Sequence, residues 1–217
     1  RINFLQLGRY GRSCEQRFRQ NFSKDFDWLE FNLKLSDKVL TGKRKAIAVD
    51  PSFISKSGKV TPWIGYFWSG CAGTTKRGLE ILGVGLIDID TKDCISLQAV
   101  QTPDTKTLEN RDATLIDWYL LVLNSMKDEL VKASSYVVAD AYFAKNNFVT
   151  GLQQMNFELI SRLRDDAALF YPTLEKPSGK KGRPRIYDGR IDFNNLDTSR
   201  VQKISSDNNQ GELYALV

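Results

Sequence analysis

Two stretches, Ala46-Ile-Ala-Val-Asp50 and Ser135-Tyr-Val-Val-Ala-Asp140, decide how this 217-residue chain folds. Each is a short apolar run with β-branched residues, and each predicts a buried strand that ends at an aspartate. Two such strands that lie side by side and parallel place their final residues at the same edge of a sheet. Functional sites of α/β folds lie at this carboxyl edge. We therefore expect Asp50 and Asp140 to lie close together.

The remaining pattern predicts a mixed α/β fold. Further strands are expected over 63–68, 79–88, 94–100 and 157–163, and helices over 1–40, from Thr105 or Thr107 to about Lys132, and over 142–155. The first three of these strands are separated by turn material and are expected to pair antiparallel. Prolines and glycines interrupt the pattern over 171–192, which predicts a loop or hairpin insertion there.

The composition excludes several kinds of site. The chain has no histidine, so Ser-His-Asp and Cys-His triads and histidine-containing zinc sites are absent. Its three cysteines are far apart and predict free, buried thiols in a reducing, cytoplasmic compartment. No apolar run is long enough to span a membrane.

The net charge of +5 is unevenly distributed. Residues 1–45 carry +6 and residues 172–190 carry +4, while residues 46–171 are acid-rich at −3. Basic flanks suit contact with the phosphate backbone of a nucleic acid, and an acidic centre suits a cation site facing that polyanion. Solvated surface charge explains the same pattern equally well.

Two carboxylates held close together repel each other unless a cation lies between them. Oxygen ligands of this kind suit Mg²⁺ or Mn²⁺, and two such ions can activate an attacking oxygen and stabilise a leaving one. This chemistry needs no histidine. The alternative is that each aspartate only forms a turn or caps a helix.

Several motifs resemble those of insertion-sequence DDE transposases of the IS4 type. They are Asn3-Phe-Leu-Gln-Leu-Gly-Arg-Tyr-Gly11, Asp50-Pro-Ser-Phe-Ile-Ser-Lys-Ser-Gly-Lys59, Gly65-Tyr-Phe-Trp-Ser-Gly70, Lys76-Arg-Gly-Leu-Glu80, Gln101-Thr-Pro103, Asp140-Ala-Tyr-Phe-Ala-Lys145, Ser161-Arg-Leu-Arg-Asp165 and Gly182-Arg-Pro-Arg-Ile-Tyr187. The resemblance covers nearly the whole chain, and its most specific part is the stretch 50–103.

The resemblance implies an RNase H-like mixed sheet flanked by helices. It divides the chain into a basic helical arm (1–45), a partial catalytic core (46–170) and a basic insertion with a following strand (171–217). It also implies an Asp-Asp-Glu site with two Mg²⁺ or Mn²⁺ ions, hydrolysis at transposon ends and strand transfer into target DNA. Double-stranded DNA is the expected partner, with a homodimer formed on it.

Asp50 and Asp140 match the first two acids of that site, as catalytic residues and metal ligands. The third acid has no match, and we expect it beyond Val217, so this stretch alone is expected to be a poor catalyst. Glu175 has a spacing from Asp140 that is seen in retroviral-type integrases, but it lies between Pro172 and Pro177 without a helical pattern and is an unsuitable third ligand.

Basic residues in three segments are candidates for DNA contact. They are Lys56 and Lys59 after the first acid, Arg162 and Arg164 on one face of the expected strand 157–163, and Lys180, Lys181, Arg183 and Arg185 in the insertion. Solvated loops and local ion pairs are the alternative interpretations.

Two other functions remain open. A non-catalytic DNA-binding remnant of a transposase would use the basic arm and the insertion without turnover. A stand-alone RNase H-like nuclease, such as a junction resolvase, would use the two acids on a branched substrate.

Overall fold

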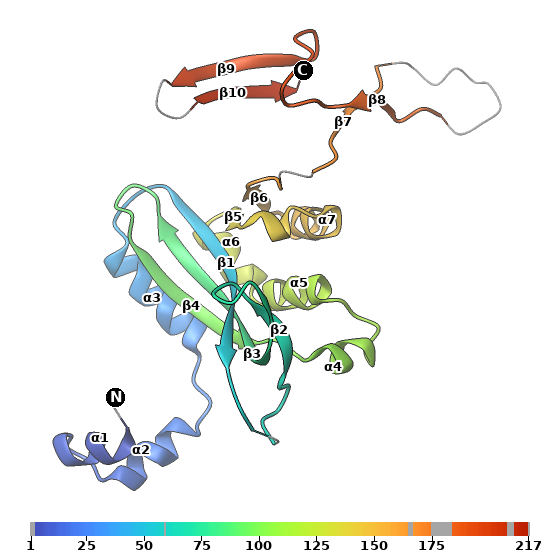
Figure 1. Cartoon of the computed structure of the whole chain (residues 1–217). Coiled ribbons are helices and arrows are strands. Elements are labelled where there is room, and N and C mark those ends of the chain that lie inside the picture. Colours follow the sequence, from blue (N-terminus) through green and yellow to red (C-terminus); the bar gives the residue numbers. More distant parts are fainter. Residues whose placement is uncertain (1–2, 59, 165–166, 175–183, 208–210, 217) are drawn as a thin grey trace. The chain divides into compact units, whose positions relative to one another are not determined.

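A mixed sheet organises the first part of the chain (Figure 1). Its central strand, β1 (Lys45–Ser55), pairs antiparallel with β3 (Thr74–Asp88) on one side and parallel with β5 (Tyr136–Ala139) on the other. The order is β2-β3-β1-β5-β6, where β2 is Gly65–Ser69 and β6 is Glu158–Ser161, and β4 (Cys94–Gln101) also pairs with β3. The expected antiparallel strands and the expected parallel pair are confirmed.

The computed structural model describes residues 3–58, 60–164, 167–174, 184–207 and 211–216, with side chains up to residue 204. By its internal contacts the chain forms two units, residues 1–162 and 163–217, and each is described by itself. Mixed parallel and antiparallel pairing with flanking helices gives the first unit an RNase H-like α/β fold. No helix within these described ranges is both long and apolar enough to cross a bilayer.

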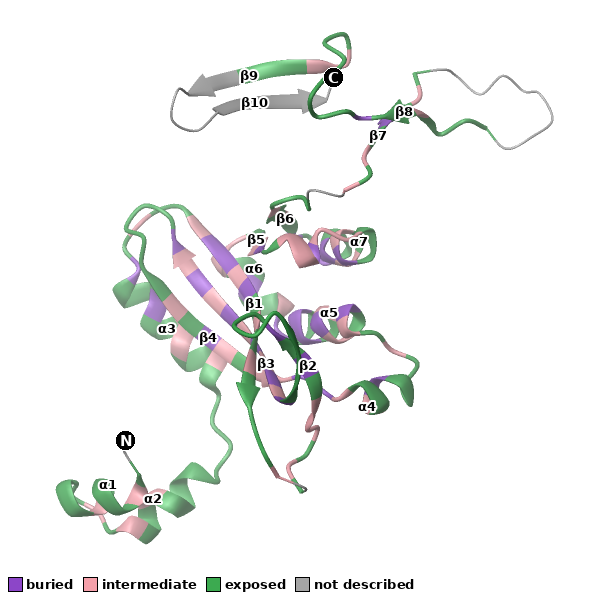
Figure 2. Ribbon diagram, in the orientation of Figure 1, coloured by how far each residue is buried: buried purple, intermediate pink, exposed green. Residues whose placement is uncertain are grey.

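The core of the first unit lies between the sheet and its helices (Figure 2). Alternate residues of the strands supply one side of it, including Ile47, Val49 and Val137, which are at most 2% exposed. The other side comes from α5 (Leu115–Ser125), α6 (Lys127–Ala133) and α7 (Asn146–Gln154), whose buried residues include Leu123 and Phe148. Burial of this apolar face fixes the register of the strands, because a shift by one residue would expose the whole face.

The expected end of the first strand at Asp50 is wrong. β1 continues through Asp50 and Pro51 to Ser55, because β3 pairs with it along its whole length, from Lys45↔Asp88 to Ser55↔Gly78. The pairing with β5 covers only residues 47–49. Proline is tolerated in this part of β1 because one side of the strand is unpaired.

The helix expected from residue 105 to about 132 is three shorter helices. The first, α4 (Thr105–Glu109), is capped by Asp104 rather than by Thr105 or Thr107. A capping box between Thr114 and Asp117 starts α5, and α6 follows at Lys127. The helix expected over 142–155 is likewise divided, into the short 3₁₀ helix η1 (Ala141–Phe143) and α7.

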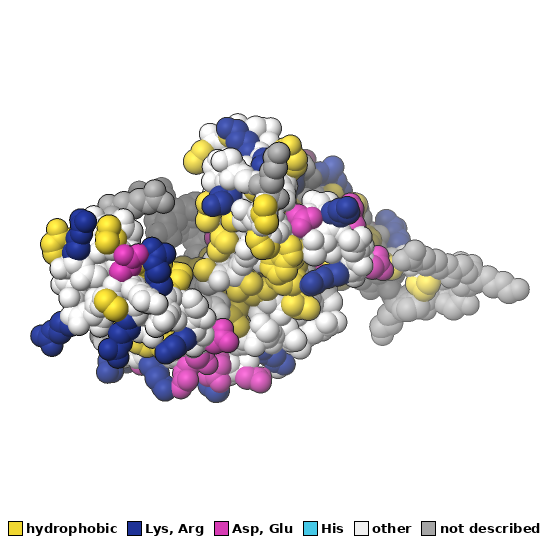
Figure 3. All heavy atoms as spheres, turned by 90° about the horizontal axis from the view of Figure 1, so that it is seen from below, with side chains coloured by type: hydrophobic (Ala, Val, Ile, Leu, Met, Phe, Trp, Pro, Cys, Tyr) yellow, Lys and Arg dark blue, Asp and Glu magenta, His cyan; other side chains and the backbone are white. Residues whose placement is uncertain are grey.

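The amino-terminal segment is helical as expected, but it forms three helices, α1 (Phe4–Tyr10), α2 (Glu15–Phe22) and α3 (Trp28–Val39). Neither α1 nor α2 has a buried residue. Lys and Arg side chains lie among exposed hydrophobic ones over this arm (Figure 3). Leu29 and Leu33 of α3 pack against the core, and Asn32 donates to the carbonyl of Leu97 in β4.

The second unit contains two hairpins. β7 (Phe170–Pro172) pairs antiparallel with β8 (Tyr187–Arg190), and β9 (Val201–Asp207) with β10 (Gly211–Leu216). The hairpin expected within 171–192 is confirmed. All three cysteines are free, as expected, but each is exposed rather than buried.

Asp88 closes the end of β3 with a cluster of backbone hydrogen bonds. Its carboxylate accepts from the amides of Gly42 at 2.6 Å, Asp90 at 3.0 Å and Thr91 at 3.1 Å. Gly42 must be glycine, because a Cβ there would lie 2.0 Å from the Asp88 carboxylate. Burial opposes ionisation of Asp88, but these donors outweigh it and hold its pKa below the ordinary aspartate value.

We expect Asp88→Asn to lower the unfolding midpoint at pH 7, because an amide cannot accept from three amides as a carboxylate does. Because the pKa of Asp88 is lower in the folded state, its carboxylate stabilises the fold at a pH above the unfolded-state pKa. That stabilisation is lost as the pH falls through the folded-state pKa. The difference from the unchanged chain should therefore shrink below about pH 4. Thermal melts from pH 2.5 to 7, with exposed Asp93→Asn as control, test this; a pH-independent difference contradicts it.

Candidate metal centre at the carboxyl edge of the sheet

Asp50 and Asp140 are neighbours across the parallel strand pair. The register runs from Ile47↔Val137 to Val49↔Ala139, so the next position on each strand is an aspartate. Parallel strands lie about 4.8 Å apart, and residues in register point to the same face. The expected shared edge is therefore confirmed, although the two residues are 90 positions apart in the sequence.

The environment of Asp50 disfavours its charged form. Burial raises the pKa of Asp50 above its ordinary value, and the negative charge of Asp140 raises it further. Both residues are nevertheless exposed to solvent, so a cation from solution can reach them. Close, mutually repelling and accessible carboxylates are the donor set that fits a divalent cation with oxygen preference.

The second acid is held in place from two sides. Its Oδ1 accepts a hydrogen bond from the backbone amide of Tyr142 at 3.0 Å, so it caps η1. Its carbonyl oxygen accepts from the Ser161 hydroxyl, at the end of β6, at 2.8 Å. The alternative role of Asp140 as a helix cap is thus real, and it leaves Oδ2 available for another partner.

A buried polar pair that the sequence analysis missed lies close to these acids. Glu80 of β3 is 6% exposed, and its carboxylate accepts from the Tyr119 hydroxyl at 2.6 Å. Burial raises the pKa of Tyr119, and the bond to Glu80 raises it further. Strand parity could have revealed Glu80, because Glu80 shares the phase of the buried residues Leu82 and Val84.

Tyr142 connects this pair with Asp140. Burial raises the pKa of Tyr142, and the charges of Glu80 and Asp140 raise it further, so its phenol lies within electrostatic reach of both. Tyr142 belongs to the motif Asp140–Lys145, but the sequence alone assigns no role to it. The structure places it at the second acid.

Two of the arginine candidates do not share a strand face. β6 ends at Ser161, so Arg162 and Arg164 lie beyond the strand and the alternation argument does not apply to them. Arg162 directly follows Ser161, whose register partner is Ala139, and so it lies at the carboxyl edge next to Asp140. Arg164 belongs to the second unit.

Among the other basic candidates, only Lys56 is described within the first unit, and it lies away from the acids. Lys56 is exposed after the end of β1, six residues of extended chain beyond Asp50 and hence about 20 Å along the strand. Arg185 is engaged locally, with the Tyr187 carbonyl at 2.9 Å and Asp188 at 3.1 Å. Lys59, Lys180, Lys181 and Arg183 lie outside the described residues.

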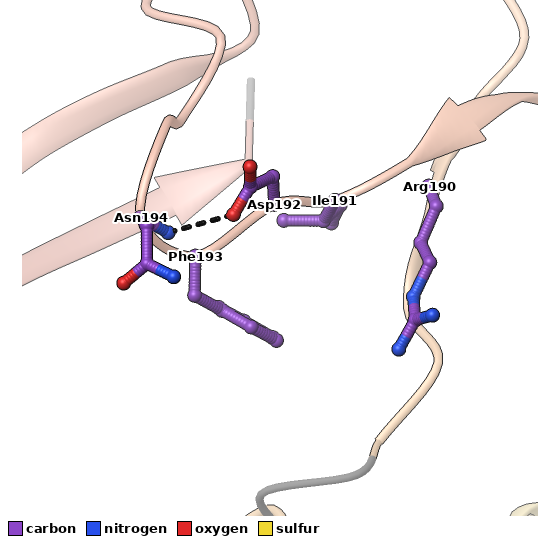
Figure 4. Close-up of a pocket in the computed structure, with 5 residues that line it drawn as sticks. All are labelled: Arg190, Ile191, Asp192, Phe193 and Asn194. Atoms are coloured by element: carbon purple, nitrogen blue, oxygen red, sulfur yellow. Dashed lines mark hydrogen bonds between the residues drawn. The ribbon is translucent and has the colours of Figure 1, made fainter.

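The described residues hold no group of three or more acids or cysteines that could bind a metal ion, so the centre consists of two carboxylates there. Glu175 is not among the described residues. A separate hollow, lined by residues 190–194 in the second unit, contains none of the predicted site residues (Figure 4). Its Asp192 carboxylate accepts from the Asn194 amide at 3.0 Å, an ordinary turn contact.

Comparison with known proteins identifies a family for the chain. A protein-family model described as DDE superfamily endonuclease matches residues 12–212, which is nearly the whole chain. No curated protein matches the chain. The match is to the DDE superfamily in general and does not distinguish the IS4 type.

We expect Asp50→Asn to stabilise the chain in EDTA at pH 7. Folding raises the pKa of Asp50, so the folded state disfavours the charged carboxylate. This loss of folding stability is absent at a pH below the ordinary aspartate pKa, and it is complete at a pH above the raised pKa. Solvent screens this exposed pair, so the gain should be only about 0.5 kcal/mol. Denaturant melts at pH 7 and pH 3 measure it, with exposed Asp37→Asn as control; equal gains at both pH values refute the explanation.

We expect Tyr119→Phe to lower the free energy of unfolding by about 1–3 kcal/mol, because it leaves the buried Glu80 carboxylate without its donor. Tyr136→Phe removes the same hydroxyl from a side chain that is 46% exposed and should cost little. Urea denaturation of both variants gives the comparison. Equal costs would mean that the hydrogen bond to Glu80 contributes nothing measurable.

Proposed function

This chain belongs to the DDE superfamily endonuclease family, and from that premise we propose that it is a DNA transposase of the IS4 type. Family membership supports a nuclease that acts on DNA with divalent metal ions. The finer assignment is hydrolysis at transposon ends and strand transfer into double-stranded target DNA by a homodimer. It rests on the motifs around Asp50 and Asp140 and on the placement of these residues.

The observation that carries the proposal is the register of β1 and β5, which makes Asp50 and Asp140 adjacent. In our proposal these two carboxylates hold Mg²⁺ or Mn²⁺, two ions in the complete site. Bound ions of this kind lower the pKa of a coordinated water or hydroxyl and stabilise the leaving oxygen of a phosphodiester. The remaining coordination positions would be filled by water and phosphate oxygens, as Mg²⁺ sites commonly are.

The chain's own residues orient the carboxylates. The amide of Tyr142 fixes one oxygen of Asp140, and β3 holds the Asp50 backbone at Gly83. Arg162 lies at the same edge and would contact a DNA phosphate. Lys56, Arg164, Arg185 and the undescribed Lys59, Lys180, Lys181 and Arg183 remain proposed DNA contacts.

One observation favours the second candidate, a DNA-binding protein without turnover. Residues 1–45 carry a net charge of +6, which suits contact with a phosphate backbone and needs no metal site. Such a protein would bind DNA through the basic arm and would not require metal. A stand-alone nuclease such as a junction resolvase has no comparable observation in its favour.

Plasmid nicking and cleavage of terminal-repeat duplexes in Mg²⁺ or Mn²⁺ test the proposed function, with the full-length protein. We expect Asp50→Asn and Asp140→Asn each to lower the rate at least about 100-fold, because removing a metal ligand removes transition-state stabilisation worth about 3 kcal/mol or more. Exposed Asp37→Asn is the matched control and should keep the rate.

A second measurement separates the two candidates. Mg²⁺ should raise the unfolding midpoint of the unchanged chain, because a ligand that binds only the folded state stabilises it, and it should not do so in Asp50→Asn. Full activity in both aspartate variants would overturn the assignment. Metal-independent DNA binding without cleavage would favour the non-catalytic protein.

A further inference from the structure

Lys145 lies in the turn that follows the second acid, between η1 and α7. Its ammonium nitrogen lies 3.7 Å from the centroid of the Tyr142 ring. A cation over the face of an aromatic ring is attracted by the ring quadrupole. The long and otherwise mobile lysine side chain is therefore held in one place.

That place is fixed relative to Asp140. The amide of Tyr142 donates to the Asp140 carboxylate, and the amide of Lys145 donates to the Phe143 carbonyl at 2.7 Å. Phe143 is fully buried and packs against the rings of Tyr142, Tyr119 and Phe148, with centroids 5.4, 5.5 and 4.8 Å apart. The turn from Asp140 to Lys145 is thus anchored in the core at its midpoint.

The positive charge of Lys145 is not neutralised by the carboxylates around it. Across the described residues no acid lies within ion-pair distance of its ammonium group, although Asp140 is only five positions away. The side chain is half-buried rather than freely solvated. A lysine that served to balance the acids would pair with them, whereas here the ammonium group lies over the Tyr142 ring.

We propose that Lys145 binds a non-bridging phosphate oxygen of the DNA backbone and, with Tyr142 as its support, positions the strand against Asp50 and Asp140. The inference rests on the proposed function and adds a substrate contact to the same site. A fixed cation compensates for the repulsion between two carboxylates and a phosphodiester, since charges a few ångströms apart interact strongly at a partly buried site. Lysine contacts to phosphate position the duplex without reading its sequence.

The test is the salt dependence of DNA binding, measured by fluorescence anisotropy on the full chain. The probe is a labelled mixed-sequence 30-base-pair duplex in MgCl₂, and all proteins carry Asp50→Asn to prevent cleavage. Lys145→Ala should weaken binding roughly tenfold near 100 mM salt, as expected for the loss of a charged contact. The slope of log affinity against log salt should fall in magnitude by about 1, which corresponds to one lost phosphate contact.

Three further variants separate substrate contact from structural support. Lys145→Arg should restore most of the affinity and the slope, because it keeps the cation. Tyr142→Phe keeps the ring and should bind normally, whereas Tyr142→Leu should weaken binding. Lys132→Ala is the matched charge control: Lys132 pairs with Glu129, and nearby Ser134 bonds the carbonyl of Lys45 at the opposite end of β1.

The outcomes distinguish this inference from the function on which it rests. Unchanged affinity and slope in Lys145→Ala, with or without a lower unfolding midpoint, would show that the lysine only stabilises the turn. This result would overturn the inference about Lys145 but not the proposed function. A loss equal to that of Lys132→Ala would overturn it as well. No DNA binding by the parent protein that carries Asp50→Asn alone would contradict the proposed function itself.

Discussion

The parallel pairing of β1 with β5 is the constraint on which the rest of the structure depends. Three residue pairs, from Ile47↔Val137 to Val49↔Ala139, join segments separated by the antiparallel strands and the helices α4 to α6. The side chains of the first and last pairs, Ile47, Val49, Val137 and Ala139, are buried on the helix-covered face, so the register cannot shift without exposing them. This register therefore sets the positions of Asp50 and Asp140 at the carboxyl edge.

The same register imposes an electrostatic cost. It brings two aspartates together, and burial together with the charge of Asp140 raises the pKa of Asp50, a cost that the packed core must offset. Local destabilisation of this kind is typical of functional sites, where groups are held in an arrangement that only a ligand relieves. In our proposal that ligand is a divalent cation, and the chain belongs to a family of DDE superfamily endonucleases.

Support for the edge comes from the layer behind it. Phe143 inserts into the core between Tyr119 and Phe148, and this insertion fixes the turn that carries Asp140, Tyr142 and Lys145. Glu80 and Tyr119 satisfy each other within the same layer. Buried polar groups are usually hydrogen-bonded, which explains why the Tyr119 hydroxyl donates to the Glu80 carboxylate.

Local patterns predicted much of the fold. Apolar β-branched runs identified the strands, and the arm was helical as its periodicity indicated. The break between α5 and α6 was missed because the apolar stripe that begins at Leu115 continues across it to Leu130. The other break is marked by the capping box of Thr114 and Asp117, which starts α5 after α4 has ended. The extension of β1 beyond Asp50 was missed because it depends on pairing with β3, which no local signal reports.

By itself the sequence determined the chemistry that is possible: no histidine, two strands that lead into aspartates, and motifs that resemble a transposase. The tertiary structure decided which residues meet. Strand pairing made Asp50 and Asp140 neighbours, buried Glu80 against Tyr119, ended β6 before Arg162 and set Lys145 over Tyr142. The physical reason is that periodicity is a property of adjacent residues, whereas distances between segments 90 residues apart are set by packing and by strand register.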